Sequence, residues 1–327
     1  GKEAIVWIAD VSGATAILRS LDSHVTVNDS AGTYGNINAG SNGVNSGDPF
    51  NVTANIQTVG GYPARMQLVI IDATGFRDST DFTQTVGIAS STTPTGPDAN
   101  GYYAYDNTET APPGTASTYL WTEIAPGLGG PGTSLGFTDG GEDQDQIAVR
   151  TLPFSFQFYG QNFSQITICT NGWLAFGAQG VDDFRNYHIG SPIGPANQIA
   201  AYWDDLVVTG IASAGVYTWS DVSTGRYVVE WRTRTLWSSA DEVFQIILHD
   251  PTAYPSPTGD GKILVQYQTV NMSANSGSND NDYATLGIQN ADHSVGLEYS
   301  YWNTYSPGAA TMANGRAILY TTDISGV

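Results

Sequence analysis

The segment LPFSFQFYG at residues 152–160 shows the pattern that decides the fold. Apolar residues occupy every second position from Leu152 to Phe158, so one side of an extended strand would be apolar. Short segments of this kind recur along the 327 residues, and the stretches between them are rich in Gly, Asn and Asp. Helical periodicity is almost absent. The chain is therefore expected to be all-β and to form antiparallel sandwiches rather than a parallel α/β sheet.

The strand pattern also suggests where the domains lie. In the N-terminal part, strands are predicted at 5–8, 24–27, 50–53 and 66–70. A Ser/Thr/Pro-rich segment at 91–96 predicts a linker between domains at 1–90 and 97–327. In the second domain, strands are predicted at 152–159, 165–170, 173–176, 199–203, 215–219, 227–231, 244–248, 263–267, 284–288, 296–299 and 317–321.

The composition excludes several classes of partner. Acidic residues outnumber basic ones by 31 to 11, which gives a formal net charge of −20. Such a surface repels nucleic acid and anionic membranes but attracts divalent cations. No apolar run approaches the ~20 residues of a membrane-spanning helix, so no membrane span is expected. The chain starts at Gly1 without a signal peptide, as a processed protein or an excised fragment would.

The N-terminal motifs SHVTVND at 23–29, YGNINAG at 34–40 and NSGDPF at 45–50 resemble an immunoglobulin-like module. Such modules follow gingipain-like peptidase domains (family C25) and other catalytic domains in large secreted bacterial proteins. The resemblance implies an immunoglobulin-like β-sandwich at 1–90, within the non-catalytic C-terminal region of a bacterial surface protein. The peptidase part, which holds the catalytic Cys and His of those proteins, is not in this chain.

The second domain carries its own resemblance. The 152–160 segment, TNGWLAFG at 170–177, IAAYWDD at 199–205 and GDGKI at 259–263 are similar to the nidogen-type extracellular domain. This similarity implies a larger, jelly-roll-like antiparallel β-sandwich at 97–327. It also implies an extracellular or cell-surface location.

No set of residues matches a catalytic site, so we expect no catalytic residues and no enzyme activity. The motif GTSLG at 132–136 lacks the strand and helix that flank a nucleophile elbow. Cys169 falls in a predicted strand, where a buried side chain is expected. Asp204 and Asp205, with Glu230, could be imagined as a glycosidase pair, but adjacent strand residues point to opposite faces.

Two acidic stretches have the oxygen density that calcium requires. Neither has EF-hand spacing, and a solvated acidic loop is the equally weighted alternative. Calcium is the one cofactor considered. The candidate ligands are Asp139, Glu142, Asp143, Asp145, Asp280 and Asp282.

The immunoglobulin-like module that the sequence resembles normally has another strand upstream of the one expected at residues 4–10. That strand is absent here, because the chain begins almost on the next strand. Such a module would leave an unpaired edge, and this chain has only two lysines, Lys2 and Lys262, to guard it. One alternative is that an upstream domain supplied the strand in a longer protein, and another is that the module is smaller. Alternatively, copies of the chain join head to tail by strand addition. The candidate subunit contacts are Ile5, Trp7, Ile8, Ile318 and Tyr320.

These features favour a non-enzymatic structural or adhesion protein, a subunit of an extracellular filament. The alternative is a carbohydrate- or surface-binding accessory region of a secreted hydrolase, in which exposed aromatic residues stack on sugars, although core packing is the expected role of most. Four sequons are candidate glycosylation sites: Asn28, Asn51, Asn162 and Asn271. The aromatic candidates are Tyr102, Tyr103, Tyr105, Trp121, Tyr187, Trp219, Trp237, Tyr301, Trp302 and Tyr305.

Overall fold

A computed structural model describes residues 5–6, 10–55, 58–110, 116–272 and 283–323. The chain divides into two compact units, Gly1–Ile88 and Ala89–Val327. Both consist of antiparallel strands, as expected, and the one helical element described is a short 3-10 turn at Pro126–Leu128. No helix in the described ranges is long and apolar enough to cross a membrane.

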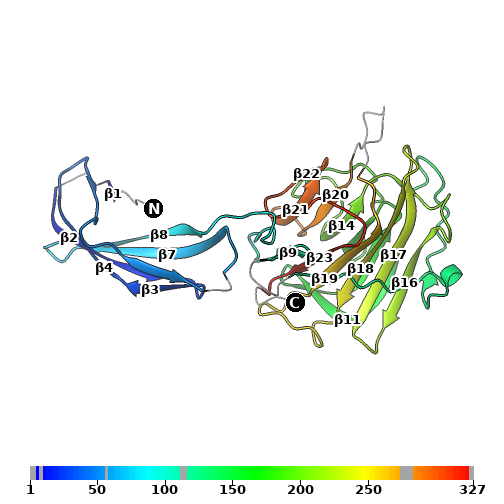
Figure 1. Cartoon of the computed structure of the whole chain (residues 1–327), viewed down its shortest axis with the longest axis horizontal. Coiled ribbons are helices and arrows are strands. Elements are labelled where there is room, and N and C mark those ends of the chain that lie inside the picture. Colours follow the sequence, from blue (N-terminus) through cyan, green and yellow to red (C-terminus); the bar gives the residue numbers. More distant parts are fainter. Residues whose placement is uncertain (1–4, 7–9, 56–57, 111–115, 273–282, 324–327) are drawn as a thin grey trace. The chain divides into compact units, whose positions relative to one another are not determined.

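The N-terminal unit has a four-stranded sheet with the order β4-β2-β7-β8 and two separate pairs, β3-β6 and β1-β5 (Figure 1). Alternate residues of β2 and β7, among them Leu18, Met66 and Leu68, are buried against Val25 of β3. The strands are β1 (Ile5–Val6), β2 (Val11–Ser20), β3 (Val25–Asp29), β4 (Ala31–Ile37), β5 (Asn42–Gly43), β6 (Asn51–Ala54), β7 (Tyr62–Ile71) and β8 (Arg77–Val86).

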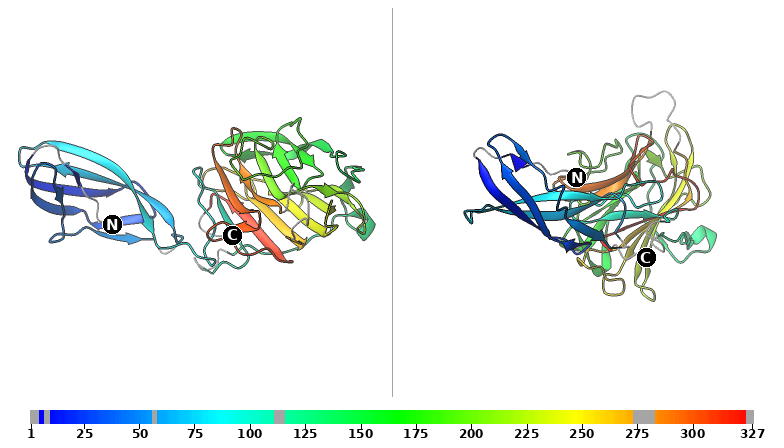
Figure 2. Two further views of the ribbon diagram at one scale, coloured as in Figure 1. Left: turned by 90° about the horizontal axis from the view of Figure 1, so that it is seen from above. Right: turned by 60° about the vertical axis from the view of Figure 1, so that its left-hand side comes forward.

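The second unit is a sandwich of two larger sheets, whose layers are visible in Figure 2. The seven-stranded sheet consists, in spatial order, of β11 (Ile147–Phe158), β12 (Gln161–Cys169), β13 (Trp173–Phe176), β14 (Gln198–Trp203), β20 (Thr285–Gln289), β21 (Gly296–Tyr301) and β22 (Thr304–Tyr305). The eight-stranded sheet consists of β10 (Thr133–Ser134), β16 (Gly215–Asp221), β17 (Arg226–Thr235), β18 (Asp241–His249), β19 (Ile263–Thr269), β23 (Arg316–Thr321) and β9 (Tyr103–Asp106), with β15 (Leu206–Val207) paired to β17.

Aromatic residues fill the core between these two sheets. The ring of Trp231 stacks on that of Phe244 with centroids 5.2 Å apart. The indole Nε1 of Trp231 donates a hydrogen bond of 2.8 Å to the carbonyl of Cys169 in the opposite sheet. The buried tryptophan therefore joins the two layers through both packing and a satisfied polar group.

The turn between β12 and β13 brings two backbone segments into close contact. Gly172 has a φ of +73°, and a Cβ atom there would lie 1.9 Å from the carbonyl oxygen of Tyr202. The amides of Ala201 and Tyr202 both donate to the carbonyl of Gly172, at 3.2 and 3.0 Å. Only glycine fits this position, because any side chain would displace the backbone at the end of β14.

The predicted linker at 91–96 is instead part of the second unit. Thr93 and Thr95 are buried, and the backbones of Thr95 and Ala104 exchange hydrogen bonds of 3.0 and 2.9 Å. Composition alone suggested a free segment. The contact with β9 that orders it is a tertiary contact, which composition does not show.

Candidate functional site

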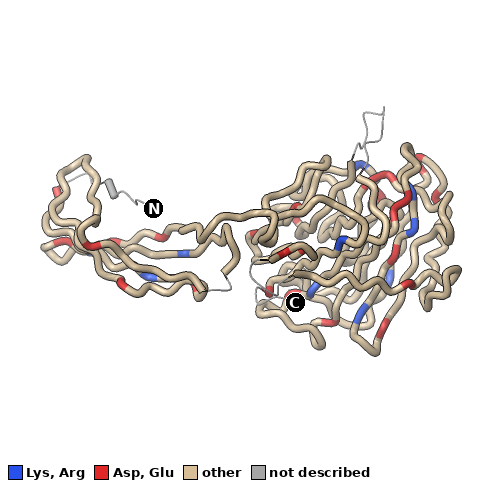
Figure 3. The backbone as a smooth tube through the Cα atoms, viewed as in Figure 1, with Lys and Arg blue, Asp and Glu red and all other residues tan. Residues whose placement is uncertain are grey.

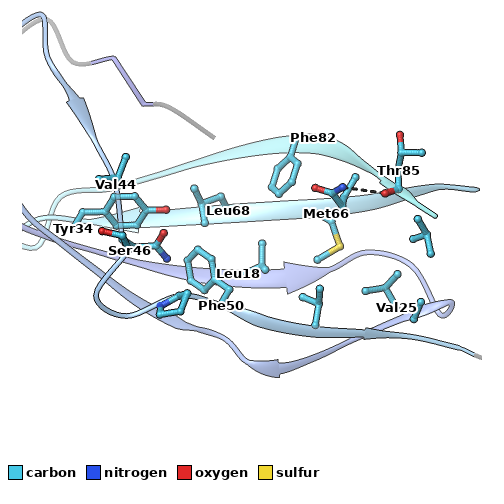
Figure 4. Close-up of a pocket in the computed structure, with 16 residues that line it drawn as sticks. Leu18, Val25, Tyr34, Val44, Ser46, Phe50, Met66, Leu68, Phe82 and Thr85 are labelled. Atoms are coloured by element: carbon cyan, nitrogen blue, oxygen red, sulfur yellow. Dashed lines mark hydrogen bonds between the residues drawn. The ribbon is translucent and has the colours of Figure 1, made fainter. Parts of the chain in front are cut away.

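An apolar groove with a volume of about 770 Å³ lies in the N-terminal unit (Figure 4). None of its lining residues carries a charge. They are Leu18, Val25, Tyr34, Val44, Asn45, Ser46, Pro49, Phe50, Val52, Ala54, Met66, Leu68, Phe82, Gln84, Thr85 and Val86.

The groove exists because the β3-β6 pair is narrower than the four-stranded sheet that it faces. Phe82, Gln84 and Val86 of β8 lie opposite Met66, Ala64 and Tyr62 in the ladder with β7, so they share the inward face. Phe82 and Val86 are nevertheless half-buried, since among the described residues the β3-β6 pair has no further strand to cover them. The result is a sandwich core that is open to solvent.

Both strands that border the groove have a free edge. Within the described residues, β8 pairs only with β7 and β6 pairs only with β3. Their unpaired N–H and C=O groups can accept another strand. Natural edge strands are usually protected by charges, but residues 82–86 of β8 and all of β6 are uncharged.

The candidate subunit contacts differ in their place in the structure. The backbone of Ile5, in β1, pairs with Gly43 of β5, next to the groove residues Val44 and Asn45. Trp7 and Ile8 lie outside the described residues. Ile318 and Tyr320 are wrong as contacts: they are 0% and 1% exposed, because β23 is paired on one side with β19 and on the other with β9.

The candidate calcium ligands also differ in their exposure to solvent. Asp139 is buried and Asp145 half-buried, whereas Glu142 and Asp143 are exposed. Asp280 and Asp282 lie outside the described residues. No group of three or more His, Cys, Asp or Glu side chains already has metal-ligand spacing in the part of the chain that the structure describes.

The ionisable residues that were considered as catalytic groups are buried. Burial raises the pKa of the Cys169 thiol well above its usual value. Glu230 is fully buried, accepts a 2.7 Å hydrogen bond from Gln245 and lies 3.3 Å from Arg232. Burial, with the nearby Glu123 charge, raises the pKa of Glu230 to about 7.

A protein-family model described as NIDO related matches residues 113–324. The chain belongs to this family. No curated protein and no solved structure matches the chain.

The match lies within the second unit, which is therefore a NIDO-related, extracellular-type β-sandwich module. The nidogen-like part of the sequence resemblance is confirmed. Nothing in the comparisons links the chain to gingipain-like peptidases.

The sequons of this NIDO-related chain are accessible. Asn28, Asn51, Asn162 and Asn271 are all exposed. The side chain of Asn28 donates to the Oδ1 of Asn51 at 2.8 Å. The same nitrogen of Asn28 also donates to Thr53, and a glycan on it would remove one of the two N–H groups, so modification of Asn28 requires a local rearrangement.

Three of the ten aromatic candidates in the NIDO-related unit are core residues, and three, including Tyr187, are exposed. Tyr102, Tyr103 and Tyr105 are buried, whereas Trp237 and Trp302 are 53% and 52% exposed. Tyr301 stacks against Trp302 with centroids 6.1 Å apart. Core packing therefore accounts for the residues of β9, and a small exposed aromatic patch remains at the β21–β22 hairpin.

Proposed function

We propose that the chain is a non-enzymatic extracellular structural protein whose N-terminal unit binds a β-strand from another copy. The open, uncharged groove bordered by β6 and β8 is the observation that supports this proposal most directly. Head-to-tail contacts of this kind do not close on themselves, so they build a filament.

Strand addition offers favourable interactions of two kinds. The free edges of β6 and β8 supply backbone hydrogen-bonding groups, and the groove buries alternate side chains of the incoming strand. Each buried Val, Ile or Phe side chain contributes about 1.5–3 kcal/mol. Several such residues are enough to offset the cost of ordering a short segment.

Charge favours a contact at this place between two copies. Each copy has a net charge of −20, and acidic residues are spread over both units (Figure 3). Two copies therefore repel each other except where uncharged surfaces meet. The groove lining is uncharged, and so is the apolar segment 4–9, AIVWIA, which is our candidate for the donated strand. Donation requires Ile5 and Val6 to leave β5, with which they pair in the single chain.

The proposal is tested by sedimentation velocity of the full chain over a wide concentration range, with electron microscopy of the concentrated sample. Growth into head-to-tail oligomers or fibres with concentration is expected. A single monomeric species at every concentration would remove the proposal.

The exposed aromatic patch supports a second candidate function, binding of a carbohydrate. Trp302 and Asn303 have φ angles of 50° and 52°, and this tight turn presents the Trp302 ring beside Tyr301. The ring centroids of His188 and Tyr301 lie 3.7 Å apart. The Nδ1 atom of His188 lies 2.9 Å from a carboxylate oxygen of Glu298. Exposed rings with polar neighbours are suited to stacking on a sugar.

Trp302→Ala is expected to weaken retention on a bound glycan roughly two- to tenfold, which corresponds to loss of about 0.5–1.5 kcal/mol of stacking. A glycan array on the wild-type chain identifies the ligand, and the variant is then titrated against it. Trp237→Ala is the control, because Trp237 is equally exposed in another turn. Equal loss in both variants, or no retention of any glycan by the wild-type chain, would eliminate this function.

A further inference from the structure

A segment without secondary structure lies on the eight-stranded sheet of the NIDO-related unit. This strap, residues 116–125, belongs to no strand, and side chains form many of the hydrogen bonds that hold it. The Ser117 hydroxyl donates to the carbonyl of Ala317 at 2.7 Å. The amide of Gln266 accepts from the Leu120 N–H at 2.5 Å and donates to the Leu120 carbonyl at 3.2 Å. The strap therefore depends on individual side chains rather than on a β-ladder.

The strap crosses four strands, because its contacts follow one row of cross-strand partners. The carbonyl of Thr122 accepts a 2.7 Å hydrogen bond from Gln245, and the amide of Ile124 donates one of 3.2 Å to Glu230. Trp231, next to Glu230 in sequence, packs in the core, so the row faces away from the core and toward the strap. The row consists of Glu230 (β17), Gln245 (β18), Gln266 (β19) and Ala317 (β23).

Two carboxylates meet a single guanidinium group at the end of this strap. The Nη1 atom of Arg232 lies 3.2 Å from a carboxylate oxygen of Glu123, which belongs to the strap, and 3.3 Å from one of Glu230. The Glu230 side chain is fully buried, whereas that of Glu123 is 26% exposed. One positive charge cannot balance two negative charges in such a place, and this favours retention of a proton by the pair.

The other groups around Glu230 do not supply a second positive charge. Its neighbour on β16 is Tyr217, and on β18 it is Gln245, whose neutral amide donates to it at 2.7 Å. Burial raises the pKa of Glu230 to about 7, and the nearby Glu123 charge adds to this effect. The pKa of Tyr217 is also raised, mainly by burial, so its phenol stays neutral. A protonated Glu230 can donate to Glu123 and so join the strap to the sheet.

We propose that Glu123 and Glu230 form a pH-dependent latch, which holds the strap on the sheet while they share a proton and loosens it when both are ionised. Lifting of the strap exposes Glu230 to solvent, where its pKa returns to the usual range of a carboxyl group. The pKa is thus higher in the closed state than in the open one. The shared proton therefore stabilises the closed state in acid, and this stabilisation is lost as the pH rises through about 7.

Hydrogen exchange of the full chain, measured by mass spectrometry on peptides from the strap, tests the latch. After correction for the intrinsic effect of pH on exchange, the protection of residues 117–125 is expected to fall about tenfold from pH 6 to pH 8. Glu230→Gln resembles the protonated form, so its protection should stay nearly constant over this range. Glu242→Gln is the matched control and should show the wild-type loss, because Glu242 is an equally buried glutamate that accepts its hydrogen bonds from Asn271.

Protection of the strap that does not change with pH in the wild-type chain would overturn the proposal. So would the same tenfold loss in the Glu230→Gln variant. If that variant loses protection throughout the chain, Glu123→Gln takes its place, since it removes the charge of the strap at a partly exposed position. The loss should then be smaller than in the wild type, and an undiminished loss would contradict the latch.

Discussion

A chain carrying Val52→Lys is expected to remain monomeric at concentrations at which the wild-type chain assembles. Val52 lies on β6 and lines the groove, so a strand bound there would bury the new ammonium group beside apolar side chains. Burying a charge without a partner costs several kcal/mol, and each 1.4 kcal/mol is a tenfold change in affinity. Association should therefore weaken by at least about 100-fold, measured by sedimentation equilibrium.

The substitution should leave the unit folded, because Val52 is 45% exposed in the unassembled chain. Val222→Lys is the control: it makes the same chemical change at a residue that is 79% exposed in a turn of the second unit. Assembly of the Val52 variant at the wild-type concentration would mean that the groove is not the joint. Loss of assembly in both variants would point to a general effect of charge.

Replacement of Gly172 by alanine is expected to destabilise the NIDO-related unit by roughly 3–5 kcal/mol. The added Cβ would lie 1.9 Å from the carbonyl oxygen of Tyr202, and the φ of +73° is unfavourable for any residue with a side chain. The two nearest atoms belong to the backbone of Tyr202, which cannot move aside without breaking its contact with the β12–β13 turn. Urea unfolding followed by tryptophan fluorescence measures the change.

Gly180→Ala provides the comparison, since nothing lies within 4 Å of a Cβ at that position. Its effect should stay within about 0.5 kcal/mol, as for most surface substitutions. Similar unfolding free energies for the two variants would show that the close approach of Gly172 to Tyr202 does not limit stability.

Local alternation was enough to predict most of the strands. The segment at 152–160 contains the end of β11, and the predicted strand at 173–176 coincides with β13. The first segment alternates apolar and polar residues, whereas the second is a short run of apolar residues that are all buried. β8 was not predicted, because Arg77–Val86 has few apolar residues and is mostly exposed.

Long-range pairing could not be predicted in the same way. β23 pairs with β9, although Ile318 and its partner Asp106 are far apart in sequence. When its neighbours are unknown, an apolar strand close to a chain end looks available for contact with another copy. This explains why Ile318 and Tyr320 were wrongly predicted to be subunit contacts. The acidic loop at 139–145 was identified from composition, but the burial of Asp139 within it depends on the fold.

The resemblance to an immunoglobulin-like module predicted an open edge beside the N-terminal strand, whereas the free edges that the structure describes at the groove belong to β6 and β8. The strands that border the opening, and the uncharged residues that line it, were known only from the fold. The four-stranded sheet presents Phe82 and Val86 to a space that the β3-β6 pair does not fill. That mismatch in width is the physical basis of the proposed assembly.

Cross-linking between copies tests this assembly most directly. One batch carries Ala9→Cys and the other Val52→Cys, while Cys169 stays unreactive because it is fully buried. Mixing the two batches with a short bismaleimide should give a covalent dimer of the two variants, far faster than mixing Ala9→Cys with Val222→Cys. Equal rates for the two mixtures, or a link that forms only within a single chain carrying both cysteines, would contradict donation of the strand by another copy.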